Sequence, residues 1–214
     1  MEQEQGNTKK LIDELVEGLE PVKCMDHPYK AVVMWLLFAG FYVGAVLYYM
    51  GMRSDLVIKI NDPTYLFEFL LITLTSLGGV ICSSWMCIPD MRCQNWLISS
   101  TLTLFSVLCG WLVLHMVFEQ EYMEHMHYSR CMIDSLIFGI VPAIAIVLFS
   151  MRGNTTHPKL MVLMNTIGVA GIGYLALRLT CGCDNIWHIL LHHSLPFVLL
   201  GGGIALVGRK YYRW

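Results

Sequence analysis

Charged side chains are scarce in this sequence. Asp, Glu, Lys and Arg make up 14% of its 214 residues, whereas a soluble domain carries about a quarter. Hydrophobic residues make up 56%, and the mean hydropathy is +0.58. This composition excludes an ordinary soluble domain and is typical of a protein embedded in a membrane. The net charge of -2 gives no indication of direct contact with nucleic acid.

The apolar residues form six long runs, each long enough to span about 30 Å of hydrocarbon. Few ionisable residues interrupt these runs, among them Glu68 and Asp134, and they lie near one end of a run. A backbone crosses lipid only as helices or as a closed barrel, and these runs lack the alternation of barrel strands. The sequence therefore predicts an all-α polytopic membrane protein whose transmembrane domain is residues 31–208. The expected spans are 31–52, 64–86, 95–118, 132–151, 160–179 and 188–208.

Two further patterns are missing. Residues 1–30 contain no apolar segment before the first span, so no cleavable signal peptide is expected. The eight cysteines are scattered rather than paired at regular spacing, so no disulfide framework is expected either. Each cysteine therefore has to be interpreted from the loop or helix in which it lies.

The positive charges favour one orientation in the membrane. If the N-terminus lies inside, ten of the 14 Lys and Arg residues fall on the cytoplasmic side and four on the opposite side. By the positive-inside rule, this asymmetry favours a cytoplasmic N-terminus and a cytoplasmic C-terminus. Residues 209–214 are basic and aromatic, which is typical of an anchor at the inner interface.

Residues 1–30 are expected to form a cytoplasmic tail with one amphipathic helix at 8–20. Its apolar residues recur at helical spacing and form one stripe, while acidic residues cover the other side. The stripe consists of Leu11, Ile12, Leu15, Val16 and Leu19. Helices that lie on membranes usually carry Lys and Arg on their polar face, but this tail has seven acidic residues against four basic ones. The charge therefore favours a basic groove on a partner protein as the binding site.

Thiol, carboxylate and imidazole groups collect in the two outer loops that follow the third and fifth spans. In both loops an aspartate follows a cysteine by three residues, a spacing that places the pair on one helical face. These groups bind soft or borderline metal ions or change with redox state. The candidate signal-sensing thiols are Cys131, Cys181 and Cys183. The candidate metal ligands are Cys131, Asp134, Cys181, Asp184 and His188.

Cys131 and Cys181 are expected to lie close together, although they are far apart in the sequence. Cys131 begins the fourth span and Cys181 follows the fifth, so both lie on the same side of the membrane. The short inner loop 152–159 favours antiparallel packing of these two helices. A disulfide requires Cα atoms within about 7 Å, and a metal ion would use the same thiols. The sequence leaves open which chemistry applies, and whether both cysteines are simply packing residues.

Three features together resemble a known family: LIDELVEGLEPV near the N-terminus, six spans, and an end that reads LRLTC…D…H-x3-H…P…G…GRKYYRW. The chain is similar to the NrsF-type bacterial membrane anti-sigma factors, named for negative regulation of sigma F. The resemblance implies a regulator, not an enzyme, that holds an extracytoplasmic-function sigma factor at the inner membrane. It also implies release of this partner under metal or oxidative stress, through outward cysteines that open the fourth span and close the fifth. Cys131 and Cys181 match these positions, and Cys183 is an additional thiol that leaves open which of the two later cysteines acts.

Two other functions are alternatives. A membrane thiol oxidoreductase coupled to a quinone would favour a C-x-x-C or vicinal pair, whereas Cys181 and Cys183 form a tighter C-x-C pair. A small metal transporter would need carboxylates or histidines deep in several spans, whereas the candidate ligands here lie near the outer face. Glu68 is either a functional group or a side chain that reaches out to water. No cofactor is expected beyond a candidate soft or borderline metal ion at the outward cysteines.

Overall fold

The six predicted spans are all helical in the computed structural model, which describes residues 2–17, 27–88, 94–118, 131–151 and 153–211. The described residues contain no strand. Six helices are long and apolar enough to cross a membrane, so the prediction of an all-α chain with six such helices is confirmed. They are α2 (Pro28–Met50), α4 (Pro63–Met86), α5 (Trp96–Phe118), α6 (Cys131–Ser150), α7 (Pro158–Thr180) and a composite last span (Ile186–Tyr211).

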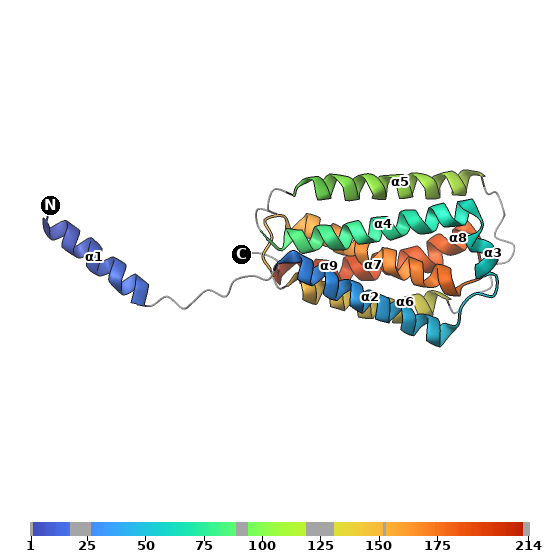
Figure 1. Ribbon diagram of the computed structural model, residues 1–214, viewed down its shortest axis with the longest axis horizontal. Helices are drawn as coiled ribbons and strands as arrows, with labels where there is room; N and C mark the ends of the chain where they lie inside the picture. Colours follow the sequence, from blue (N-terminus) through green and yellow to red (C-terminus); the bar gives the residue numbers. More distant parts are fainter. Residues whose placement is uncertain (1, 18–26, 89–93, 119–130, 152, 212–214) are drawn as a thin grey trace.

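The N-terminal helix α1 (Glu2–Glu17) precedes these six and lies apart from them (Figure 1). It begins earlier than the 8–20 range expected from the sequence. The apolar stripe at Leu11, Ile12, Leu15 and Val16 is more than half exposed at each position. The fifth predicted member of the stripe, Leu19, lies outside the described residues. The stripe is therefore an apolar surface that no part of the described chain covers.

The most buried of the six helices is α7, which packs against α4, α6 and the last span. Glycines permit this close approach. A Cβ atom at Gly173 would lie 2.1 Å from the ring of Phe197, and one at Gly171 would lie 2.4 Å from Cβ of Ser76. Both positions exclude any larger residue without movement of the helices. The helix α7 therefore forms the centre of the bundle, and its C-terminal end is held among its neighbours (Figure 1).

The loop before α4 contains a short helix, α3 (Leu56–Ile60), that the sequence pattern did not indicate. The start of α4 itself follows from local chemistry. Pro63 occupies the first turn, where its missing N–H costs nothing. The Asp62 side chain accepts a hydrogen bond of 2.9 Å from the Thr64 N–H, as an N-cap residue does. The short helix α3 packs against α4, and its residue Leu56 is buried.

The last span is not a continuous α-helix. It consists of α8 (Ile186–His188), a π-helical turn (Ile189–Ser194), α9 (Leu195–Gly208) and a final 3₁₀ turn (Arg209–Tyr211). The π turn is visible in its hydrogen bonds, because the Leu195 N–H donates to the Leu190 carbonyl, five residues back. This irregular stretch lies at the same end of the bundle as the start of α6 and the end of α7, which we call the Cys181 end.

Candidate functional site

Two cysteines from different helices meet at the Cys181 end. Cys131 is the first residue of α6, and Cys181 directly follows the last residue of α7. Their sulfur atoms lie 3.9 Å apart, although fifty residues separate them in the chain. This distance is too long for a disulfide bond of about 2.05 Å, so both side chains are thiols. The structure thus brings together the two cysteines that the sequence placed at one end of the bundle.

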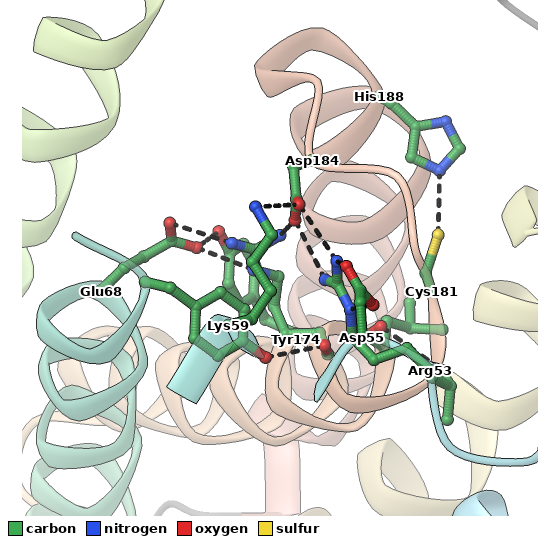
Figure 2. A network of polar contacts seen from close by, with 12 residues as sticks. Arg53, Asp55, Lys59, Glu68, Tyr174, Cys181, Asp184 and His188 are labelled. Atoms are coloured by element: carbon green, nitrogen blue, oxygen red, sulfur yellow. Dashed lines mark hydrogen bonds and ion pairs between the residues drawn. The ribbon is translucent and has the colours of Figure 1, made fainter. Parts of the chain in front are cut away.

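Two histidines of the last span complete this cluster. His188 Nε2 lies 3.6 Å from the Cys181 sulfur (Figure 2). His193 is fully buried, and apart from a contact with the Cys131 thiol its ring nitrogens have no hydrogen-bond partner among the described residues. One ligand atom from each of the four residues lies within 4.8 Å of every other. We call Cys131, Cys181, His188 and His193 the Cys2His2 cluster.

The π turn explains why His188 and His193 are neighbours. Residues five apart in an α-helix lie about 140° apart around the axis, whereas the wider turn of a π-helix, closed by i→i+5 hydrogen bonds, brings them closer to one face. Pro196 accounts for the irregularity, because it has no N–H to donate to the His192 carbonyl. That carbonyl accepts a hydrogen bond of 2.6 Å from the Ser135 hydroxyl of α6 instead. His193 was not predicted as a ligand, because α-helical spacing places it on a different face from His188. Pro196 was the available signal of an irregular turn.

The other predicted ligands lie outside the cluster. Asp134 and Cys183 are half-buried, but neither contributes an atom to the group of four. Asp184 also lies outside it and has a different set of partners. Of the predicted metal ligands, the structure therefore brings together Cys131, Cys181 and His188.

Asp184 binds three cations (Figure 2). Arg53 donates to both carboxylate oxygens at 3.0 Å, Arg178 donates at 2.7 Å, and Lys59 Nζ lies 2.7 Å from the second oxygen. Burial alone would raise the pKa of Asp184, but these cations outweigh it and hold the pKa well below its ordinary value. The carboxylate is therefore ionised at neutral pH, with its oxygens occupied by cations rather than directed at the cysteines.

Arg53 connects the loop after α2 to this carboxylate. Its side chain is only 1% exposed, and it also contacts Asp55 at 2.7 Å. The hydrogen bonds with Asp55 and Asp184 raise the pKa of Arg53 above its ordinary value, and the bond from Arg53 lowers the pKa of Asp55. The Arg53 backbone N–H donates to the Leu179 carbonyl at 3.1 Å. The loop is thus fixed to the end of α7 by both main-chain and side-chain contacts.

The ionic network continues into the bundle through Arg178. Its Nε lies 3.1 Å from a carboxylate oxygen of Glu68 on α4, and both side chains are less than 10% exposed. The Tyr174 hydroxyl donates to the same carboxylate. Glu68 therefore points inward to a buried cation and does not reach out to water.

The cluster and the ionic network share one short loop, residues 181–185. Cys181 begins this loop and Asp184 lies three residues later. Contact with Cys131, followed by burial, raises the pKa of Cys181 above its ordinary value, so the thiol is protonated at neutral pH. Two chemical changes are open to the cluster: oxidation of the paired thiols to a disulfide, or replacement of their protons by a metal ion. Both changes would act on Cys181, which lies in the same loop as Asp184.

The family model described as "Negative regulator of sigma F" (NrsF) matches residues 15–214. This range includes the C-terminal part of α1, all six apolar helices and every residue of the cluster and the ionic network. No curated protein and no solved structure matches the chain. Since the family match covers nearly the whole sequence, the chain belongs to the NrsF family of negative regulators of sigma F.

Proposed function

We propose that this chain is a membrane-bound anti-sigma factor that sequesters an extracytoplasmic-function sigma factor at the bacterial inner membrane. Membership of the family supports regulation of a sigma factor, and the six apolar helices support insertion into a bilayer. In this proposal the protein acts by binding and release, and it catalyses no reaction. Its N-terminal tail, residues 1–30, faces the cytoplasm, where the sigma factor is.

The exposed apolar stripe of α1 carries this proposal. Four of its members, Leu11, Ile12, Leu15 and Val16, are more than half exposed, and the acidic residues of α1 would keep the helix off an anionic membrane surface. Full burial of one such side chain contributes about 1.5–3 kcal/mol. An amphipathic helix that lays its apolar face into a protein groove is a recurrent mode of recognition. Acidic residues beside the stripe suit a groove on a basic, DNA-binding protein.

The signal would act at the opposite end of the bundle, where Cys131 and Cys181 meet. Their sulfurs are 3.9 Å apart and belong to two different helices. A metal or oxidative signal that joins the two thiols changes the packing of α6 against α7. Such a change biases a two-state helix bundle, and the tail at its other end then releases the sigma factor.

The binding role of α1 is tested by Leu15→Asp in the full-length protein. Placing a carboxylate in the apolar contact should weaken binding of the cognate sigma factor by about ten- to a hundredfold, because central apolar anchors dominate such interfaces. Leu15→Met keeps the side chain apolar and serves as the matched control. The measurement is co-purification and titration with the sigma factor in detergent. Equal affinity of the two variants would remove α1 from the interface.

A further inference from the structure

The Cys2His2 cluster has the composition of a metal site rather than of a thiol pair alone. It draws Cys131 from α6, Cys181 from the end of α7, and His188 and His193 from the last span. The fully buried His193 contacts the Cys131 thiol and has no other hydrogen-bond partner for its ring nitrogens among the described residues. Buried polar groups in folded proteins are almost always satisfied, so such a histidine calls for a specific partner. One ligand atom of His193 lies within 4.8 Å of a ligand atom from each of the other three residues.

The spacing of these atoms matches tetrahedral coordination. Zinc binds thiolate sulfur at about 2.3 Å and imidazole nitrogen at about 2.0–2.1 Å. Tetrahedral angles then place two sulfurs about 3.8 Å apart, and a sulfur and a nitrogen about 3.6 Å apart. The corresponding distances here are 3.9 Å between Cys131 and Cys181, and 3.6 Å between Cys181 and His188. These two distances match the tetrahedral values, and all four ligand atoms lie within 4.8 Å of one another.

The charges of these ligands select a divalent ion. Two thiolates carry a total charge of two minus and two neutral imidazoles carry none, so a divalent cation makes the site electrically neutral. Neutrality matters here, because an uncompensated charge buried among apolar helices is costly. Two sulfur and two nitrogen ligands favour zinc and similar ions over magnesium or calcium, which prefer oxygen. Because four protein ligands fill a tetrahedral shell, the site has no open position for catalysis.

We propose that Cys131, Cys181, His188 and His193 together bind one divalent metal ion of the zinc class. This inference rests on the proposed function in one respect, since it assigns the signal at the paired thiols to metal binding. Binding replaces two thiol protons by the ion, so two protons are released for each ion bound and no electron is transferred. The bound ion links α6, the end of α7 and the π turn of the last span. It also fixes the loop that carries Asp184.

The direct test is a titration of the full-length protein with Co²⁺, carried out in detergent under reducing, oxygen-free conditions. Co²⁺ reports tetrahedral sulfur and nitrogen coordination by strong visible absorption bands, which Zn²⁺ then removes by competition. The expected result is that each chain binds one Co²⁺ with release of two protons, and that one Zn²⁺ per chain displaces it. The absence of tetrahedral bands in the folded wild-type protein would overturn the proposal.

Matched variants identify the ligands. Cys181→Ser and His193→Gln should each weaken Co²⁺ binding by more than about a hundredfold, beyond the loss caused by changes around a metal site. Cys183→Ser and His192→Gln alter the same residue types within two positions and should bind as the wild type does. Because His193 is buried, Cys181→Ser keeps the test valid if the His193 variant does not fold. Wild-type affinity in folded Cys181→Ser would overturn the assignment.

Binding of the sigma factor by the same preparations separates the two proposals. If the wild-type protein binds the sigma factor but neither Co²⁺ nor Zn²⁺, the metal site is wrong and the proposed function stands. If it binds one ion at the four residues but does not bind the sigma factor even in its metal-free form, the metal site stands and the proposed function is wrong.

Discussion

At the scale of single residues, Asp184 holds three parts of the chain together. Its carboxylate contacts Arg53 from the loop after α2, Lys59 from α3 and Arg178 from α7. The side chains of Arg53 and Arg178 are almost fully buried. Two buried guanidinium groups therefore depend on one carboxylate for part of their charge compensation, and its removal leaves them poorly compensated.

We expect Asp184→Asn to destabilise the folded protein by about 2 kcal/mol at neutral pH, because two buried arginines lose an anionic partner. The partial exposure of Asp184 to water limits the loss. The pKa of Asp184 is lowered by folding. Its contribution is therefore fully present above the unfolded-state pKa of about 3.9 and is lost as the pH falls towards the folded-state pKa.

The measurement is thermal unfolding in detergent of wild-type and Asp184→Asn protein across a pH series. The difference between the two proteins should shrink below about pH 4. Asp55→Asn is the matched control, because Asp55 contacts the same arginine with a more exposed carboxylate, and its effect should be smaller. A loss in Asp184→Asn that is the same at all pH values would show that the charge is not responsible.

The sequence predicted some of these residue contacts and not others, for a physical reason. Cys131 and Cys181 could be paired because the two membrane crossings between them, α6 and α7, return the chain to the same end of the bundle. Asp134 and Asp184 could not be distinguished, because both follow a cysteine by three residues. Only the fold shows that Asp184 faces Arg53 and Lys59. Ion pairs between residues more than a hundred positions apart leave no periodic pattern in a single sequence.

At the scale of elements, the last span depends on Pro196. Because proline cannot donate a main-chain hydrogen bond, the preceding turn opens to the π form and the His192 carbonyl bonds to Ser135. Hydropathy predicted this span but not its π turn, because an average over about 19 residues does not detect a change of helix type within one turn. The short helix α3 was missed for the same reason, since it is too short for a periodic signal.

We expect Pro196→Ala to weaken Co²⁺ binding at the Cys2His2 cluster by about ten- to a hundredfold. Alanine restores the N–H that an α-helical turn requires, which would rotate His193 away from His188. Pro142→Ala is the matched control, because Pro142 also lies inside an apolar helix but away from the cluster. The comparison is a Co²⁺ titration of the three proteins. Unchanged affinity in Pro196→Ala would show that the π turn does not depend on the missing donor.

At the scale of the whole molecule, the cluster and the N-terminal helix belong to opposite ends of the six-helix bundle (Figure 1). The structure confirms six helices that are long and apolar enough to cross a membrane. The direction in which they insert is inferred only from the distribution of Lys and Arg. The sidedness of the molecule decides whether the cysteines meet the cell exterior or the cytoplasm. The orientation is therefore a separate prediction.

We expect a reporter that is active only in the cytoplasm to work when fused at Trp214 or within 152–159, and to fail within 119–130. The reason is that basic residues are in excess on the side of the membrane that holds the C-terminus and the loop 152–159. The measurement is reporter activity in cells, normalised to the amount of fusion protein in the membrane fraction. An active fusion within 119–130 would reverse the topology and place the cysteines inside.

The most direct test of the whole proposal is the location of the sigma factor in cells before and after exposure to Zn²⁺ or an oxidant. With the wild-type protein, the sigma factor should move from the membrane fraction to the cytoplasm on exposure. With the double variant Cys131→Ser and Cys181→Ser, it should stay in the membrane fraction, because the thiols of two helices can no longer be joined. Cys183→Ser should respond as the wild type does. Normal release by the double variant would contradict a signal received at these two cysteines.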